Sequence, residues 1–161
     1  MTMTRARDLM TKRFLRISTE HTLRETLGIL LHGEQKKYDT GAIVIIDQEG
    51  EFAGIATPSQ LALGLVGKWK SNDEPAKSAF TAHAETRLSE TVDTILNPKQ
   101  PIASPQTSLA RLMLMASEGE FECIPVIESG RVEGLVYVSD IFKAVASISL
   151  TPETEGINLP G

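Results

Sequence analysis

The 161-residue sequence contains a single cysteine, Cys123, and its three histidines, His21, His32 and His83, lie far apart. An internal disulfide and a cysteine-built zinc site are therefore excluded, and the histidines have no metal-binding spacing. No apolar run approaches the ~20 residues that span a bilayer, and Met1–Phe14 has no apolar signal-peptide segment. We therefore expect a cytoplasmic protein with no metal site and no membrane partner.

Charged residues show a modest acidic excess, 21 Asp+Glu against 16 Lys+Arg, which gives a net charge of −5. Broad nucleic-acid binding needs basic side chains to neutralise phosphates, so we expect no nucleic-acid partner. The sequence also has no glycine-rich phosphate loop ending in Lys-Ser/Thr, no His-Glu-x-x-His and no nucleophile elbow. We therefore expect no catalytic residues, no catalytic cofactor and no enzymatic activity. The apolar content of 41% is typical of a globular protein.

An internal duplication is the main positive feature, because the second half repeats the first at a spacing of roughly 80–86 residues. The apolar positions of a short helix at Ala6–Met10 recur at Val92–Leu96. A capping box at Thr22–Glu25 begins a longer amphipathic helix, and Ser108 begins its counterpart in the second half.

Two strand pairs complete the repeats. The first joins Ala42–Asp47 to Phe52–Ala56, and the second joins Cys123–Glu128 to Val132–Val136, with a glycine in each turn. Each pair leads into a final helix. A further short strand is predicted before the second helix of each repeat, at the β-branched residues Ile17 and Ile102. Each repeat is therefore predicted as helix, strand, helix, strand, strand, helix.

The fold class predicted from this order is α+β, with the two repeats packed sheet to sheet about a pseudo-two-fold axis. The first repeat is predicted to cover residues 1–70 and the second residues 88–150. The polar segment 71–87 is predicted to be a linker, with a helical turn around 76–84. Residues 151–161 are predicted to form a loosely ordered tail.

The sequence resembles a tandem pair of cystathionine β-synthase (CBS) domains, also called a Bateman module, over about residues 4–146. The resemblance is carried in the first copy by Ala6–Met10 and Asp47–Thr57, and in the second copy by Ile124–Ile127 and Gly130–Ile141. It implies a regulatory module that binds an adenosine-containing metabolite such as AMP, ADP or ATP between the repeats. It also implies a homodimer.

The ligand motif of this family is Gly, an apolar residue, any residue, Thr or Ser, two spacers and Asp. The first copy has Thr57 at the hydroxyl position but Gln60 in place of the Asp, whereas the second copy has Asp140 but Tyr137 in place of the hydroxyl residue. A carboxylate at this corner can accept hydrogen bonds from both ribose hydroxyls, so the cleft beside Asp140 is the better candidate.

The resemblance therefore implies a set of nucleotide-binding residues, with S-adenosylmethionine as a further regulatory ligand to test. In the second copy the set is Asp140, Ser139, Tyr137, Ile102, Ala103, Cys123 and Pro125, and in the first copy it is Thr57, Ile17, Ser18 and Ala42.

Other interpretations stay open for these residues. Asp140 and Ser139 are equally explained as a helix cap, and Thr57 followed by proline is typical of one. The departures at Gln60 and Tyr137, together with Glu122 near the expected phosphate position, favour a second hypothesis. It is a dimerisation or docking scaffold whose ligand sites are empty. A third hypothesis is a ligand other than adenine.

Partners are predicted on the same basis. The final helix places Phe142, Val145 and Ala146 on one apolar stripe, which packs either within the module or against a second copy. We expect a homodimer and an unidentified regulated protein as partners.

Overall fold

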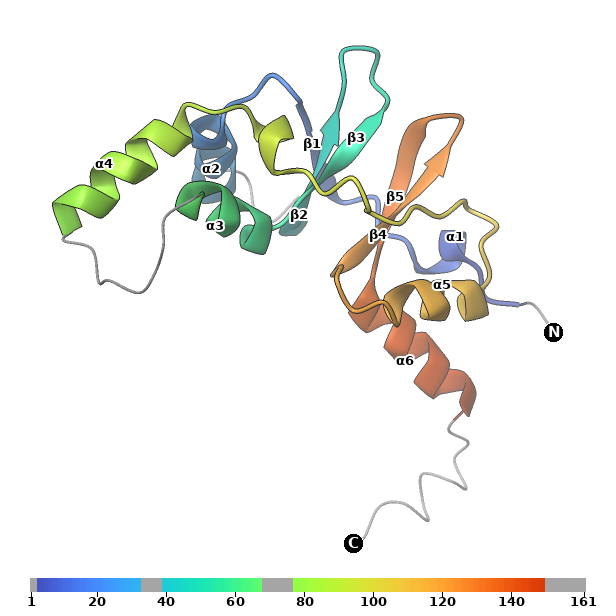
Figure 1. The fold of residues 1–161 in the computed structure, drawn as a ribbon. Helices are drawn as coiled ribbons and strands as arrows, with labels where there is room; N and C mark the ends of the chain where they lie inside the picture. Colours follow the sequence, from blue (N-terminus) through green and yellow to red (C-terminus); the bar gives the residue numbers. More distant parts are fainter. Residues whose placement is uncertain (1–2, 33–38, 68–76, 150–161) are drawn as a thin grey trace, which may run out of the picture. The chain divides into compact units, whose positions relative to one another are not determined.

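The computed structural model describes residues 3–32, 39–67 and 77–149, so the predicted tail at 151–161 lies outside the described residues (Figure 1). The chain divides into two compact units. One comprises Met1–Lys12 and Pro101–Gly161, and the other comprises Arg13–Gln100. Each unit mixes helices and strands, which confirms the α+β class; the predicted sheet-to-sheet packing of the repeats stays a prediction.

The unit formed by Arg13–Gln100 contains a three-stranded sheet in the order β1-β2-β3. Its strands are β1 (Phe14–Ser18), β2 (Asp39–Ile46) and β3 (Phe52–Ala56). β1 runs parallel to β2, and β3 runs antiparallel to it. The β-branched run Ile43–Ile45 is buried in the central strand, as a continuous apolar run predicts.

The helices of this unit are α2 (Leu23–His32), α3 (Pro58–Val66), α4 (Lys77–Leu88) and the 3₁₀ turn η1 (Val92–Ile95). α2 begins at the predicted capping box: the Thr22 backbone N–H donates to Glu25 Oε1 over 3.0 Å, and the Glu25 N–H donates to Thr22 Oγ1 over 3.1 Å. The Thr22 N–H bond is the main reason that the pKa of Glu25 lies below its usual value.

α4 extends the single helical turn predicted around residues 76–84 into a complete helix. Two of its basic side chains bind carbonyl groups in the last turn of α3. His83 Nε2 lies 2.6 Å from the Val66 carbonyl oxygen, and Arg87 Nε donates to the Gly64 carbonyl oxygen over 2.7 Å. Basic groups at this end stabilise a helix because its last carbonyls lack intrahelical partners and carry partial negative charge.

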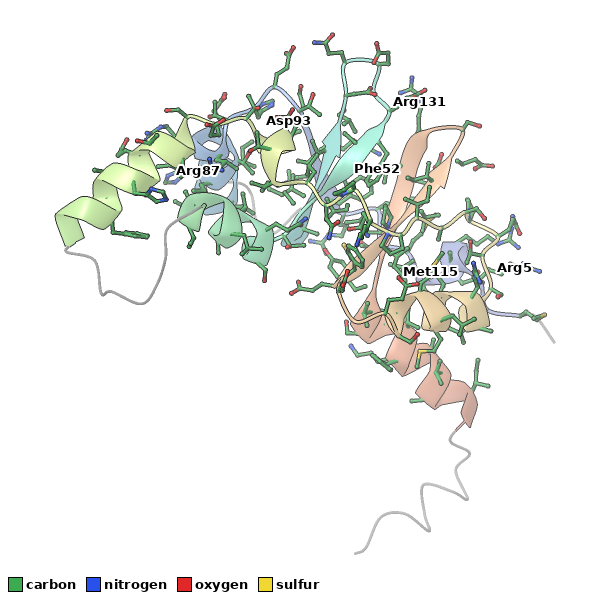
Figure 2. All side chains as sticks on the ribbon, in the orientation of Figure 1. Arg5, Phe52, Arg87, Asp93, Met115 and Arg131 are labelled. Carbon is green, nitrogen blue, oxygen red and sulfur yellow. The ribbon has the colours of Figure 1, made fainter. Side chains whose placement is uncertain are left out.

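The second unit contains the antiparallel pair β4 (Cys123–Glu128) and β5 (Arg131–Tyr137) with helices α1 (Ala6–Leu9), α5 (Leu109–Ala116) and α6 (Val138–Ser149). A parallel bridge from Ala103 to Val126 stands where the other unit has the full strand β1. Arg5, labelled in Figure 2, holds the start of α1 in this unit, since its Nη1 donates to the Gln106 carbonyl oxygen over 2.7 Å.

The two units exchange the first segments of the two sequence repeats. α1 lies at the start of the first repeat but belongs to the unit of α5, α6 and the β4-β5 pair, where Thr11 bridges Leu135. η1 lies at the start of the second repeat but belongs to the unit of β1-β2-β3, where the Val92 N–H donates to the His21 carbonyl oxygen. Each compact unit therefore combines most of one sequence repeat with the first segment of the other.

Each unit has its own apolar core. The core of Arg13–Gln100 contains Ile17, Leu23, Ile43, Ile45, Ala56, Leu61 and Val92. The core of the other unit contains Ala6, Ala103, Leu112, Ile124, Val126, Val136 and Ile141. Among the helices of the described ranges, none is both long enough and apolar enough to cross a bilayer.

Candidate functional site

The corner between β5 and α6 carries the predicted carboxylate, Asp140. α6 begins at Val138, so Ser139 and Asp140 lie inside its first turn, whereas the cap interpretation places one of them before it. The Asp140 carboxylate accepts no hydrogen bond from any residue that the structure describes, and its nearest cation is Lys143, whose Nζ lies 4.0 Å from Oδ1. With 44% of its side chain exposed, Asp140 is accessible to a ligand.

The equivalent corner between β3 and α3 is internally satisfied. The Gln60 N–H donates to Thr57 Oγ1 over 3.3 Å, which makes Thr57 the N-cap of α3. In return, Gln60 Oε1 accepts from the Thr57 backbone N–H over 3.0 Å and from its hydroxyl over 3.1 Å. Thr57 therefore has the capping role that the sequence indicates, and the side chain at the position of the missing carboxylate completes a capping box.

Four more candidates of the second repeat lie on or beside β4. Cys123 pairs with Tyr137 across the strand pair, so the start of β4 lies beside the end of β5. The Ala103 N–H donates to the Pro125 carbonyl oxygen over 2.9 Å, which places Ala103 against the middle of the strand. Ile102, just before it, is 51% exposed, so its apolar side chain is accessible beside the strand.

The remaining candidates lie in the unit Arg13–Gln100. Ile17 and Ser18 end β1, opposite Ile45 and Ile46 of β2. Ser18 also shapes the loop after β1, because its hydroxyl accepts from the Glu20 N–H over 3.1 Å. Ala42 is fully buried in β2. The structure thus places four of the predicted site residues in the unit Arg13–Gln100 and the other seven together in the unit of β4 and β5, namely Asp140, Ser139, Tyr137, Ile102, Ala103, Cys123 and Pro125.

The Cys123 thiol has no acidic character that a nucleophile or metal ligand would need. Burial, assisted by the negative charge of Glu122, raises its pKa from 9.0 to about 12. Within the described residues, no three His, Cys, Asp or Glu side chains lie close enough together to hold a metal ion.

Two surface features were not predicted as sites from the sequence. A cavity of about 150 Å³ lies beside α3, α4 and η1, and an apolar groove of about 240 Å³ lies between α5 and α6. The cavity is lined by Gln60, Leu63, Gly64, Arg87, Thr94 and Ile95, and the groove by Leu109, Ala110, Met113, Val145 and Ile148. Arg87 falls in the predicted linker, so only the packing of α4 on α3 shows that it belongs to a cavity.

The fold thus defines an α+β protein built from two copies of one unit, each with a corner where its last strand enters a helix. The family model of the CBS domain matches residues 6–67 and 75–147. The chain therefore belongs to the CBS domain family and carries two copies of the domain. None of the curated proteins compared with the chain matches it.

Solved structures agree on the fold. The cytosolic domain of the Mg²⁺ channel MgtE, solved in complex with ATP, is 21% identical, with a TM-score of 0.65 over 87% of this chain and 48% of that one. This chain therefore spans about half the length of that domain. A CBS-domain containing protein from Agrobacterium tumefaciens is 22% identical, with a TM-score of 0.64 over 88% of this chain and 99% of that one. The protein CBSX2, solved in complex with AMP, is 15% identical, with a TM-score of 0.64 over 91% of this chain and 98% of that one.

Proposed function

We propose that this chain is a regulatory module that senses an adenosine-containing metabolite at the corner between β5 and α6. The observation that carries the proposal is the Asp140 carboxylate, which is accessible and accepts no hydrogen bond from the described residues. A side chain that served only as a helix cap would bond to the N–H groups of its own first turn, as Thr57 does in α3. The two similar folds solved with ATP and with AMP add support for an adenine nucleotide.

The recognition follows from ordinary hydrogen-bond chemistry. A carboxylate only accepts, and the two neighbouring hydroxyls of a ribose both donate, so one Asp140 side chain holds both. The exposed side chain of Ile102, next to the buried Ala103, offers an apolar surface for the flat base. Binding would change the packing of the two repeats, and a partner protein would respond to that change. The proposal gives the chain no catalytic step, and its cytoplasmic location stays a prediction.

Isothermal titration with AMP, ADP, ATP and S-adenosylmethionine tests the proposal. Loss of a charge-assisted hydrogen bond costs about 1.5–3 kcal/mol, so Asp140→Asn should weaken binding by at least about tenfold. Glu133→Gln is the matched control, because Glu133 is a carboxylate of the same unit that lies outside the predicted site and should leave the affinity unchanged. Absence of binding below about millimolar concentration, or equal affinity of the Asp140→Asn variant, would contradict the proposal.

The alternative function is a dimerisation or docking scaffold with empty ligand sites. Two observations favour it: the apolar groove between α5 and α6, and the closed capping box that engages Gln60 where the family has a carboxylate. Under this alternative the groove binds a second copy of the chain. An adenine nucleotide recovered from the purified protein would argue against empty sites, whereas a dimer alone is compatible with both functions.

A further inference from the structure

The cavity beside α3, α4 and η1 lies wholly within the unit Arg13–Gln100. Its lining combines two polar side chains that donate hydrogen bonds, Arg87 and Gln60, with the apolar side chains of Leu63 and Ile95. At about 150 Å³ it is smaller than the ~300–1,000 Å³ pockets that hold drug-sized ligands, so a nucleotide does not fit within it.

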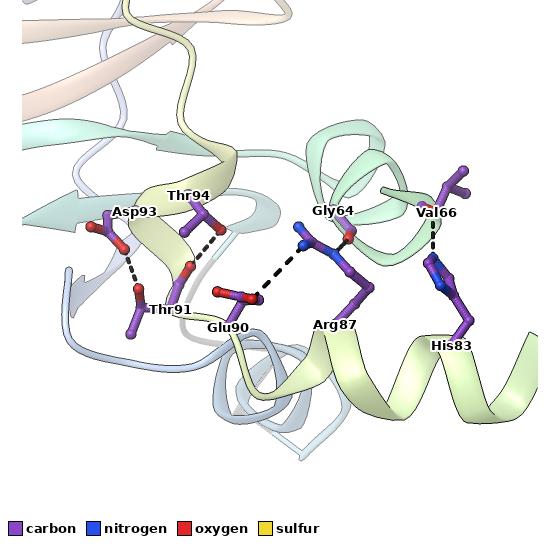
Figure 3. Close-up of polar contacts among 8 residues, drawn as sticks. All are labelled: Gly64, Val66, His83, Arg87, Glu90, Thr91, Asp93 and Thr94. Atoms are coloured by element: carbon purple, nitrogen blue, oxygen red, sulfur yellow. Dashed lines mark hydrogen bonds and ion pairs between the residues drawn. The ribbon is translucent and has the colours of Figure 1, made fainter. Parts of the chain in front are cut away.

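Arg87 is held in place by one edge of its guanidinium group. Its Nε donates to the Gly64 carbonyl oxygen over 2.7 Å, and the side chain is 28% exposed (Figure 3). Gly67 permits this close packing, because a Cβ at that position would lie 3.1 Å from Arg87 Nε. The Nη groups make no hydrogen bond to the described residues, and among those residues their ion-pair partner is Glu90, at 3.9 Å from Nη1. Arg87 is therefore a positioned cation with hydrogen-bond donors to spare.

Gln60 adds a second oriented donor. Its Oε1 accepts both from the Thr57 N–H and from the Thr57 hydroxyl. A backbone N–H can only donate, so this bond fixes which end of the amide faces Thr57 and turns the NH₂ group away from it. The Nε2 atom donates to no residue that the structure describes. The lining of one small cavity thus carries the Gln60 NH₂ group and the Arg87 Nη groups, neither of which donates a hydrogen bond to the described residues, and Glu90 lies 3.9 Å from Arg87 Nη1.

Arg87 is the charged residue on the cavity lining and favours an anion, whereas the neighbouring Glu90 opposes one. Thr94 is neutral, and its hydroxyl donates to the Thr91 carbonyl oxygen over 2.8 Å. Asp93 accepts a bond from the Thr91 hydroxyl and does not line the cavity (Figure 3). Glu90 is the acidic side chain beside Arg87, but at 3.9 Å and 48% exposure its attraction to the guanidinium is weakened by solvent.

We propose that this cavity binds a small organic acid, with the carboxylate held by Arg87 and Gln60 and a short apolar portion against Leu63 and Ile95. A guanidinium group and a carboxylate are both planar and pair through parallel hydrogen bonds. The apolar wall distinguishes a carboxylic acid with a hydrocarbon part from a fully hydrated inorganic ion. The site lies in a different compact unit from Asp140 and does not depend on nucleotide binding there.

Titration of the full ¹⁵N-labelled chain with sodium propionate, followed by the Arg Nε–H and Gln amide signals, tests this proposal. Sodium chloride at the same ionic strength serves as the reference titration. Two charge-assisted hydrogen bonds in an open cavity predict a saturable shift with a dissociation constant on the order of millimolar. Acetate, which lacks one CH₂ group of propionate, should bind about fourfold more weakly, since a buried CH₂ contributes about 0.8 kcal/mol.

Gln60→Glu is the decisive variant. Glutamate preserves the capping box, because its carboxylate also accepts from Thr57, but it removes the donor and places a negative charge on the cavity lining. We expect an unchanged melting temperature and propionate binding weakened at least about tenfold. Glu90→Gln should strengthen binding about two- to fivefold, because it removes the opposing charge. Asp140→Asn should leave propionate binding unchanged.

Three results would overturn the assignment. The first is a linear, non-saturating shift equal to that produced by chloride, and the second is saturable propionate binding that Gln60→Glu leaves intact. The third is tighter binding of inorganic phosphate than of propionate, because phosphate gains nothing from the apolar wall. Arg87→Lys is a supporting variant with an expected loss of binding, but the conclusion depends on Gln60→Glu, which leaves the contact between α4 and α3 in place.

Discussion

Met10 packs directly on Gly134: a Cβ atom built on this glycine would lie 2.7 Å from Met10 Sδ and 2.9 Å from Met10 Cβ. The same relationship occurs in the other unit, where a Cβ on Gly54 would lie 2.9 Å from Leu96 Cδ1. Met10 and Leu96 occupy corresponding positions in the two sequence repeats, and so do the two glycines. The repeated glycine before each strand-to-helix corner is therefore required for packing, apart from any role in ligand binding.

Gly134→Ala should destabilise the chain by about 1–3 kcal/mol, the usual effect of overpacking a close contact. The added methyl group would lie too close to the Met10 Cβ as well as to its Sδ. A rotamer change can move the Sδ but not the Cβ, so the backbone at Met10, directly after α1, must shift. Gly54→Ala should have an effect of similar size through Leu96. Urea unfolding measures both effects, and a loss below about 0.5 kcal/mol would show that the contact relaxes at little cost.

Gly28→Ala provides the matched control, with the opposite expected sign. Gly28 lies in the interior of α2, and a Cβ there meets no atom within 4 Å. Alanine in place of glycine inside a helix should therefore stabilise the chain by about 0.5–1 kcal/mol, because the unfolded chain loses conformational freedom. A destabilised Gly28→Ala variant would show that general sensitivity to substitution, and not close contact, explains the result at Gly134.

The Cys123 thiol should resist modification in the folded protein and react with a thiol reagent such as DTNB only on unfolding. Burial keeps the thiol neutral by raising its pKa to about 12. As pH rises above 9.0, the ordinary value, the unfolded chain releases this proton while the folded chain keeps it. The unfolded state then binds fewer protons, so the free energy of unfolding should fall by up to about 1.4 kcal/mol per pH unit in this range.

Cys123→Val separates this effect from the titration of other groups. The variant keeps an apolar side chain of similar size but has no thiol, so its free energy of unfolding should fall less than that of the natural chain between about pH 9 and pH 11. Equal pH dependence of the two proteins, or rapid DTNB labelling under native conditions, would show that Cys123 is exposed or ionised in the folded state.

Local sequence patterns predicted the elements well. The continuous apolar run Ile43–Ile46 forms part of the central strand β2, and Thr22–Glu25 forms the predicted capping box. At Thr57 the sequence predicts the cap, whereas its partner Gln60 stands out in the sequence as a departure from the family motif. The spacing Thr-x-x-Gln is itself a capping-box pattern, so this role was visible in the sequence.

Features that depend on tertiary contacts were missed. The packing of α4 on α3 includes hydrogen bonds from His83 and Arg87, and nothing in the low apolar content of the α4 segment indicates them. The exchange of α1 and η1 between the compact units could not be predicted either, because two similar repeats offer each short segment two similar surfaces. The candidate carboxylate Asp140 came from the resemblance, whereas its lack of a hydrogen bond within the described chain came only from the structure.

Association of two copies through the groove between α5 and α6 gives the last prediction. Ile148 lines this groove and is 64% exposed, so Ile148→Lys places a charge on the apolar surface without disturbing a core. If a second copy covers the groove, light scattering after size exclusion should show a dimer for the natural chain and at least about a tenfold weaker dimer for Ile148→Lys, since a buried unpaired charge is costly. Ser147→Lys adds the same charge on the neighbouring residue, whose hydroxyl donates to the Lys143 carbonyl oxygen, and should leave the dimer intact. A monomer at high concentration, or equal weakening by both substitutions, would assign the groove to a different occupant.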